Sequence, residues 1–263
     1  MRPIRLYWAG RTVPNFGDSL SPIIVEYLSG RPVRFASIKR CQMIAVGSII
    51  HKIEIRWPRW LSGRLRPIKV WGSGSLHEEG LLPTTSDQIY AVRGARTRDV
   101  MRLPIDTPLG DPGTLLARMI DARRIPKRHR WGIIPHCDDR ADPALSRIIG
   151  ANNATIIDVT DPSPLDVARR IASCDFIASS SLHGLIAADA FGIPNVHLPL
   201  GDRVIGGAWK FSDYATSVGR KIASANVGDD LPSLEPFASY ADPKAISGVC
   251  DALEHAFSKM ELA

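Results

Sequence analysis

The chain is poor in the residues that build disulfide frameworks and metal centres. Its four cysteines lie far apart, and no pair has the spacing of a zinc or redox motif. The seven histidines show no ligand-like pairing, and no Asp-x-Asp triplet supplies the ligands of a metal-bridged nucleotide-sugar site. The segment Gly72-Ser73-Gly74 lacks the third glycine of a dinucleotide fingerprint, and there is no P-loop. We therefore expect neither a metal nor a cofactor.

Long apolar segments are also missing. No run approaches the roughly 20 residues that a bilayer-spanning helix needs, and the N-terminal residues show no signal-peptide h-region or small-residue cleavage site. Together with the scattered cysteines, these absences predict a cytoplasmic protein. The 263 residues, 44% hydrophobic and 23% charged, are typical of one large globular domain or two small ones.

The chain carries an uneven surplus of basic charge. Its net charge is +6, and residues 52–69 hold six lysines and arginines against one acid, interleaved with Trp57 and Trp60. A second basic run covers residues 123–130. Neither run accompanies a helix-turn-helix, zinc finger or aromatic RNP-like strand, so we expect no nucleic-acid partner. Bases beside tryptophans favour an anionic membrane face, which predicts a peripheral contact at the inner face of the cytoplasmic membrane; a solvated loop or an oligomer contact is the alternative.

Strand and helix patterns alternate along the chain. Apolar runs predict strands at residues 4–9, 33–36, 43–46, 68–71, 88–92, 131–135, 154–159, 174–178 and 195–198. Caps and periodicity predict helices from Asp18 or Ser19 to 28, over 94–103, from 114, over 164–173, over 185–191 and from 243. This alternation implies an α/β fold with two parallel-sheet halves. The predicted parts are residues 1–120, a linker at 121–130, a second half at 131–225, and a C-terminal loop and helix at 226–263 that can cross back to the first half.

The segment from Ser179 to Gly184 is the most informative local feature. It follows a buried strand and precedes a helix, so it places His183 where a strand ends and a helix begins. Ligands bind at such places in open α/β sheets, and the free N–H groups of a helix start favour an anion. This pattern predicts acid/base chemistry by His183 on a phosphorylated substrate. The alternative is a helix-capping serine cluster beside a core histidine.

Several motifs, in order, resemble one family. They are Asn15 to Leu20, Gly47 to His51, Val70 to Gly74, Ala91 to Gly94, Gly110 to Gly113, Ile134 to His136, Ser179 to Gly184, Gly192 to Pro194, and Lys210-Phe211 with Tyr214. Their order over residues 4–220 is similar to that of the polysaccharide pyruvyl transferases, especially the xanthan-type ketal pyruvate transferases. Many members of that family carry arginine where this chain has Ser181, so one anion contact expected of the family lacks its residue here.

The resemblance implies a fold and a reaction. The fold would be two Rossmann-like halves facing a cleft, in a GT-B-like arrangement. The donor would be phosphoenolpyruvate, and the acceptor two hydroxyls of one sugar in a lipid-linked exopolysaccharide precursor; phosphate would leave, and a cyclic pyruvate ketal would form. Protonation of the enol carbon near neutral pH suits His183.

The resemblance also implies the residues of the site. Arg93 and Lys210 would hold the carboxylate and phosphate of the donor, and the helix start would add Ser181, Leu182 and Gly184. The residues expected to line the pocket are Asn15, Gly17, Asp18, Gly72, Ser73, Asp111 and His136.

Structural alternatives exist for most of these residues. Arg93 could pair with Asp99 or another acid, and Lys210 could be a solvated lysine in a loop. Asn15, Gly17 and Asp18 could only shape a turn and cap a helix, and His136 could only pack. For Asp111 we favour a turn-forming role over a catalytic one. The alternative functions are a GT-B-type nucleotide-sugar glycosyltransferase and a non-catalytic sugar-binding subunit of a polysaccharide assembly complex.

Overall fold

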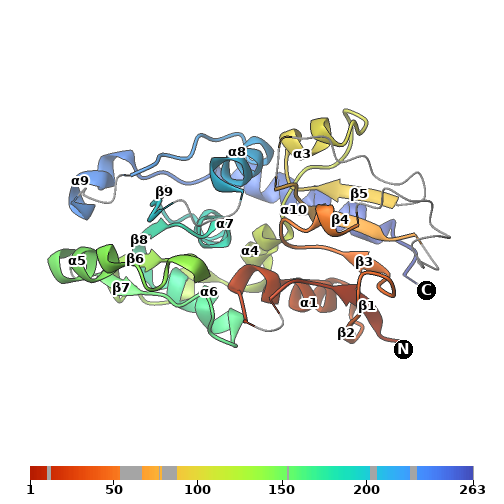
Figure 1. Ribbon diagram of the computed structural model, residues 1–263, viewed down its shortest axis with the longest axis horizontal. Helices are drawn as coiled ribbons and strands as arrows, with labels where there is room; N and C mark the ends of the chain where they lie inside the picture. The colour runs from red at the N-terminus through yellow and green to blue at the C-terminus, as the bar shows by residue number, and fades with distance from the viewer. Residues whose placement is uncertain are drawn as a thin grey trace.

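A computed structural model shows two parallel sheets side by side, with helices packed around and between them (Figure 1). It describes residues 1–10, 13–53, 67–76, 78, 88–152, 154–201, 206–225 and 230–262. The predicted α/β fold with two parallel-sheet halves is confirmed. The GT-B-like arrangement and the domain boundaries stay predictions.

The first half is built on a five-stranded sheet in the order β2-β1-β3-β4-β5. Its strands are β1 (Ile4–Tyr7), β2 (Val33–Phe35), β3 (Met43–Ile44), β4 (Lys69–Ser73) and β5 (Gln88–Val92), all paired in parallel. Its helical segments are α1 (Phe16–Ser29), η1 (Ile50–Lys52), α3 (Ala95–Val100), η2 (Pro112–Leu115) and α4 (Leu116–Met119). The β5 prediction is confirmed residue for residue.

The second half is built on a four-stranded sheet in the order β7-β6-β8-β9. Its strands are β6 (His129–Ile134), β7 (Ala154–Ile156), β8 (Cys174–Ser179) and β9 (Asn195–His197), again all parallel. Its helical segments are η4 (Cys137–Asp139), α5 (Pro143–Asn152), α6 (Pro164–Ala172), α7 (Leu182–Ala190) and α8 (Gly207–Ser217). Residues 121–130 contain the short turn η3 (Ala122–Arg124) and the start of β6.

The C-terminal part joins the two halves. After α9 (Leu231–Leu234) and η5 (Glu235–Phe237), the helix α10 (Pro243–Ser258) packs against the sheet of the first half (Figure 1). The indole N–H of Trp71 donates to the carbonyl of Leu253 at 3.0 Å, and its ring meets Phe257 edge-on at 5.0 Å. The predicted helix start is confirmed, because Asp242 caps α10 by accepting from the N–H of Lys244.

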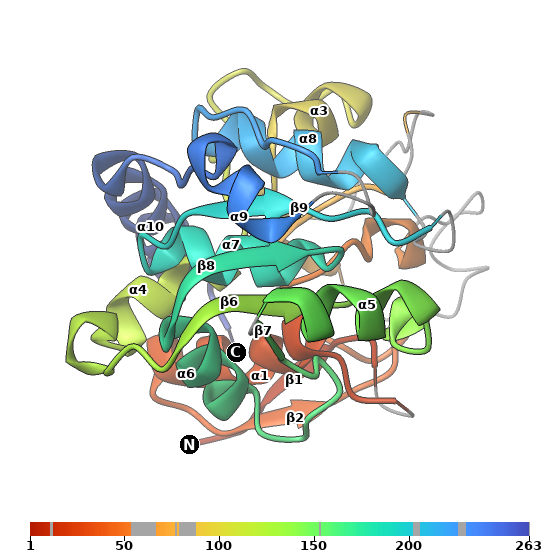
Figure 2. The same ribbon diagram turned by 90° about the vertical axis from the view of Figure 1, so that its left-hand side faces the viewer.

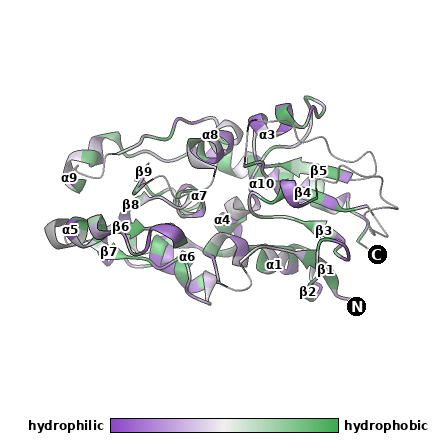
Figure 3. Cartoon of the chain, viewed as in Figure 1, coloured by the Kyte–Doolittle hydropathy of each residue, from purple (hydrophilic) through white to green (hydrophobic). Residues whose placement is uncertain are grey.

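One hydrophobic core runs through both halves. Figure 3 shows apolar residues along the strands and both colours on α1 and α6, which pack against each other between the sheets. Buried side chains from β1, α1, α6, α7 and α10 belong to the same cluster. Figure 2 shows α7 crossing behind β8. The halves are therefore fixed to each other by burial of apolar surface.

Local structure differs from the sequence prediction in several places. The helix α7 begins at Leu182, before the predicted start at 185, and β7 ends at Ile156, before the predicted end at 159. The cap of α1 is Asn15, whose side chain accepts from the N–H of Gly17 at 3.2 Å, so the prediction of Asp18 or Ser19 was wrong. Asp18 lies instead in the first turn, where the helix dipole favours an acid. The helix α5 was not predicted, and the loop-like surroundings expected for Lys210 are the helix α8.

Candidate active site

A cavity of about 270 Å³ lies where the carboxyl ends of both sheets face each other. Segments that follow β1, β3, β4, β6 and β8 all contribute to its wall, as expected for ligand sites in parallel α/β sheets. The N-terminal turns of α1 and α7 both reach it. The lining residues are Ala9, Asn15, Asp18, Gly47, Ser48, Ile49, His51, Lys52, Leu76, His136, Asp138, Ser181, Leu182, His183 and Lys210.

The turn at Ser179 to Ser181, here called the serine turn, is held by hydrogen bonds of its own side chains. The hydroxyl of Ser179 lies within hydrogen-bonding distance of the carbonyls of Ile134 and Ser181, to one of which it donates, and it accepts from the N–H of Ser181. The hydroxyl of Ser180 accepts from the N–H of His136 and donates to Asp139 at 2.7 Å. These bonds tie the end of β8 to the end of β6. The side chain of Ser181 caps nothing in α7 and lines the cavity instead.

His183 lies in the first turn of α7, as predicted, and its ring is held between the two halves. Its Nε2 lies 3.5 Å from Oδ2 of Asp111, a residue of the first half. The other edge of the ring lies against Gly17, where a Cβ would fall 1.9 Å from Nδ1. Residue 17 must therefore lack a side chain for the ring to adopt this position.

Asp18 is a second group able to exchange a proton near neutral pH. Burial raises its pKa from 3.8 to about 6, the negative charge of Asp111 adds to this rise, and His183 and Lys210 partly offset it. Its carboxylate lies against the backbone of Gly47, where a Cβ would fall 2.7 Å from Oδ1. The sequence marked Asp18 as pocket-lining, and it lines the cavity.

Lys210 brings a cation to the cavity from α8. The residue is only 6% exposed, so it is not the solvated loop lysine of the alternative interpretation. Burial lowers its pKa to about 8, and the positive charge of Arg93 contributes to this fall. A buried ammonium group with a lowered pKa gains more from an incoming anion than an exposed one does.

Arg93 lies in a different setting from the one expected. It is fully buried, and its Nε donates to Oδ2 of Asp213 at 2.9 Å, while its other nitrogens donate to the hydroxyl of Ser48 and the carbonyl of Ser75. Asp213 also accepts from the N–H and hydroxyl of Thr97. Arg93 does not line the cavity and, as one alternative proposed, pairs with an acid. It fixes α8, and with it Lys210, to the first half.

Other predicted residues separate into two groups. Asn15, His136 and Leu182 line the cavity. The backbone of Gly72 packs against Pro112, Ser73 donates to the carbonyl of Gly47 at 2.7 Å, and Gly184 packs against Ser179 and Ile134. Five predicted residues therefore support the cavity wall without lining the cavity: Gly17, Gly72, Ser73, Asp111 and Gly184.

Four polar residues of the wall were not predicted from the sequence: Ser48, His51, Lys52 and Asp138. The first two belong to the segment from Gly47 to His51, which already carried part of the family resemblance. That motif was the signal that could have found them. Lys52 was assigned only to the basic segment.

A group of three consecutive residues could offer metal ligands. The side-chain ligand atoms of His136, Cys137 and Asp138 lie within 4.8 Å of one another, and among the described residues this is the group with such geometry. Burial lowers the pKa of His136, and burial raises the pKa of the Cys137 thiol. The expectation of a metal-free site stays a prediction.

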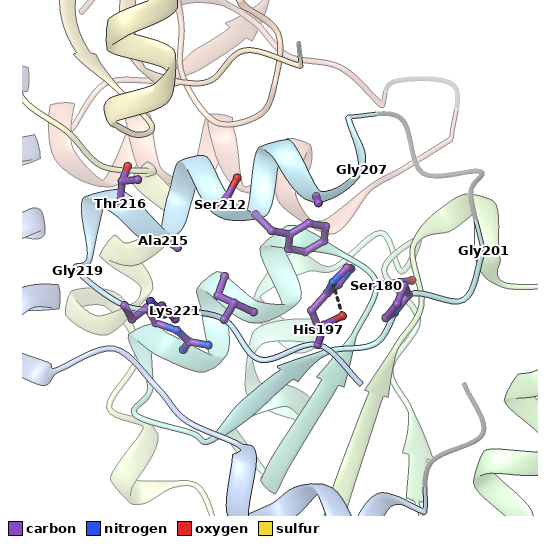
Figure 4. A pocket seen from close by; sticks show the side chains of 15 residues that line it. Ser180, His197, Gly201, Gly207, Ser212, Ala215, Thr216, Gly219 and Lys221 are labelled. Atoms are coloured by element: carbon purple, nitrogen blue, oxygen red, sulfur yellow. Dashed lines mark hydrogen bonds between the residues drawn. The ribbon is translucent and has the colours of Figure 1, made fainter. Parts of the chain in front are cut away.

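A larger cavity of about 810 Å³ lies on the other side of the serine turn (Figure 4). It is formed by α8, β9 and residues 219–224, and the rings of His197 and Phe211 lie in it with their centroids 4.0 Å apart and their planes tilted by 35°. Burial lowers the pKa of His197 to about 4. That imidazole is therefore neutral near pH 7 and poorly matched to proton transfer there. The smaller cavity, with Asp18, His183 and Lys210, is the better candidate for chemistry.

The basic, tryptophan-containing segment at residues 52–69 lies largely outside the described residues. Its predicted membrane contact stays a prediction. Among the described helices, none has both the length and the apolar composition needed to cross a bilayer.

Comparison with known proteins supports the resemblance carried by the motifs. Residues 100–202 match the model of the polysaccharide pyruvyl transferase family. The chain is 26% identical to the succinoglycan biosynthesis protein ExoV of Rhizobium meliloti over 81% of its own length and 64% of that protein. It is 35% identical to an uncharacterized protein of Acanthamoeba polyphaga mimivirus over 50% of its length and 48% of that protein.

The chain thus spans about half to two thirds of the curated relatives that it matches. A solved structure of an uncharacterized protein from Klebsiella pneumoniae aligns with a TM-score of 0.48 at 12% identity, covering 81% of this chain and 87% of that one. The family model and the ExoV match both support the similarity of this chain to the polysaccharide pyruvyl transferases.

Proposed function

We propose that the protein transfers the enolpyruvyl group of phosphoenolpyruvate to two hydroxyls of one sugar in an exopolysaccharide precursor and releases phosphate. The observation that carries the proposal is the cavity in which Asp18, His183 and Lys210 meet between two helix N-termini. Helix N-termini and a buried lysine favour a small ligand with two anionic groups. Two proton-exchanging groups suit a reaction that moves two protons.

The first step forms one ketal bond. Protonated His183 gives a proton to C3 of phosphoenolpyruvate, and the cationic C2 is attacked by a first sugar hydroxyl, whose proton passes to the Asp18 carboxylate. Lys210 and the start of α7, with Ser181 and Leu182, hold the carboxylate and phosphate of the donor. The serine at position 181 supplies a hydroxyl where many family members have arginine.

The second step closes the ring. The C2–O bond to phosphate breaks, and protonated Asp18 returns its proton to the departing phosphate. The second hydroxyl attacks C2 and gives its proton to neutral His183, which restores the starting state. The two hydroxyl protons thus end on phosphate and, through His183, on the methyl carbon of the ketal.

The proposal is tested by incubating the protein with phosphoenolpyruvate and lipid-linked oligosaccharides and following product mass and released phosphate. We expect one pyruvyl ketal per acceptor and one phosphate per ketal, without added metal and in the presence of EDTA. Loss of activity with EDTA that magnesium or manganese restores would instead favour a metal-dependent glycosyltransferase.

Donor binding is tested separately by thermal unfolding. A ligand that binds only the folded state stabilises it by about 2.7 kcal/mol at 100 times its dissociation constant, a shift of several degrees at this size. Phosphoenolpyruvate should give this shift, and UDP- and GDP-sugars should not. A shift with nucleotide sugars alone would favour the glycosyltransferase, and no shift with millimolar amounts of either would favour a non-catalytic subunit.

A further inference from the structure

Asp111 and His183 form a pair that the proposed reaction has not yet used. Oδ2 of Asp111 and Nε2 of His183 are 3.5 Å apart, although the residues belong to different halves. Both atoms are buried, and within the described residues neither has a hydrogen-bond partner. The Asp111 side chain is fully buried, and that of His183 is 12% exposed. Unpartnered buried polar atoms are costly, so two of them at nearly hydrogen-bonding distance indicate a pair that closes by a small movement.

The carboxylate of Asp111 is oriented by its own turn. Its Oδ1 accepts from the N–H of Gly113 at 2.9 Å and caps η2, and its carbonyl accepts from the hydroxyl of Thr114. Gly113 also lies against the ring, since a Cβ there would fall 3.7 Å from Cδ2 of His183. With Oδ1 engaged, Oδ2 is the oxygen left for the imidazole.

The two ring nitrogens of His183 therefore have different surroundings. Nε2 faces a buried acceptor, while the Nδ1 edge of the ring packs against the backbone of Gly17, in the space that a Cβ would fill. A neutral imidazole carries one proton, and the acceptor beside one nitrogen decides which nitrogen holds it. Other charged or titratable groups near the ring are Asp18 from α1, Lys210 from α8 and His136 from the segment after β6.

We propose that Asp111 is a positioning residue that keeps the proton of neutral His183 on Nε2, so that Nδ1 exchanges the proton with the substrate. The inference rests on the proposed function in assigning acid/base work to His183. It deepens that assignment by naming the working atom and the residue that orients it. The turn-forming role of Asp111 is retained, because one oxygen caps η2 and the other orients the ring.

The test combines the ring's tautomer with kinetics. In wild-type protein, the 15N chemical shifts of His183, assigned with a His183→Gln variant, should show a protonated Nε2 and a bare Nδ1. In Asp111→Asn, the amide oxygen can still cap η2 while the amide N–H₂ faces Nε2, so the proton should move to Nδ1. We expect kcat to fall by about 100-fold or more, by analogy with a carboxylate that orients a catalytic histidine, with KM for phosphoenolpyruvate nearly unchanged.

A matched control is available in the same chain. Asp121 caps the short turn η3 in the same way, accepting from the N–H of Arg123, but it is away from the cavity. Asp121→Asn should leave tautomer and kcat unchanged. A protonated Nδ1 in the wild type, or normal kcat in Asp111→Asn, would overturn the positioning role. A correct tautomer that depends on Asp111, in a protein that makes no pyruvyl ketal, would overturn the proposed function and leave the pair standing.

Discussion

Two buried cations, Arg93 and Lys210, lie where the halves of this molecule meet, and they differ in what surrounds them. Around Arg93 and Asp213, both fully buried, the polar partners are fixed: Ser48, Ser75 and Thr97 complete the hydrogen bonds. Around Lys210, only three residues away on α8, the side chain meets a cavity and its pKa is lowered to about 8.

The difference separates a cation buried among fixed partners from one that also lines a cavity. A guanidinium surrounded by protein partners gains little from a ligand, because binding would have to break existing bonds. A buried ammonium that lines a cavity can meet an anion there without the loss of a buried ion pair such as Arg93–Asp213. Arg93 and Lys210 were both predicted from the sequence to hold the anionic groups of the donor. Substitutions at the two positions are now expected to have different effects.

The largest effect is expected from breaking the buried pair. Asp213→Ala leaves the Arg93 charge buried without its acid, which should lower the free energy of unfolding by about 3–5 kcal/mol. Asp251→Ala breaks an exposed pair with Arg118, whose side chains are 39% and 65% exposed for arginine and aspartate, and should cost less than about 1 kcal/mol. Urea unfolding measures both. Equal losses in the two variants would show that the buried pair does not hold the halves together.

The next largest effect is a loss of turnover with donor binding largely kept. His183→Ala should lower kcat for ketal formation by about 100-fold or more, while the melting shift with phosphoenolpyruvate is largely kept. The control is His255→Ala, on the exposed side of α10, which should change neither quantity. Near-normal turnover in the His183 variant would remove this residue from the mechanism.

A smaller effect is expected from the cavity cation. Lys210→Met keeps the length of the side chain but removes its charge, so the KM for phosphoenolpyruvate should rise by about tenfold or more, the loss of one charge-assisted hydrogen bond. Its melting temperature without ligand should stay close to that of the wild type. Lys244→Met, on an exposed residue of α10, is the control. An unchanged KM would place the donor away from Lys210.

The subtlest prediction concerns the shape of the pH profile. Activity should rise as Asp18, with a pKa near 6, loses its proton and becomes a base. It should fall above about pH 8, where Lys210 loses the charge that binds the donor. Plots of kcat/KM against pH report such groups in the free enzyme. Asp18→Asn should remove the acidic limb, and Asp166→Asn, on the exposed face of α6, should keep both limbs; an acidic limb that survives in Asp18→Asn belongs to another group.

Short-range patterns in the sequence were enough for most strands and for the main turn. Apolar runs predicted β5 to the residue and β8 to within one residue, because buried parallel strands are continuous apolar segments. The helix α10 carries its own signals, an Asp-Pro start and an apolar face. In contrast, α8 follows Gly206 and begins at Gly207 without a side-chain cap, so no local sequence signal predicted this helix. It is held by α3 through Asp213 and Thr97.

The sequence by itself determined the α/β alternation, the strand-turn-helix around His183 and the family resemblance, because each depends on neighbours a few residues apart. Only the tertiary structure decided the partners of the charged groups. Arg93 meets Asp213, and His183 meets Asp111 and Gly17, across long stretches of chain. The sequence does not indicate whether a charged residue will be enclosed by protein partners or will line a cavity. That outcome depends on how the two halves pack, and it separates the enclosed Arg93 from Lys210, which lines the cavity.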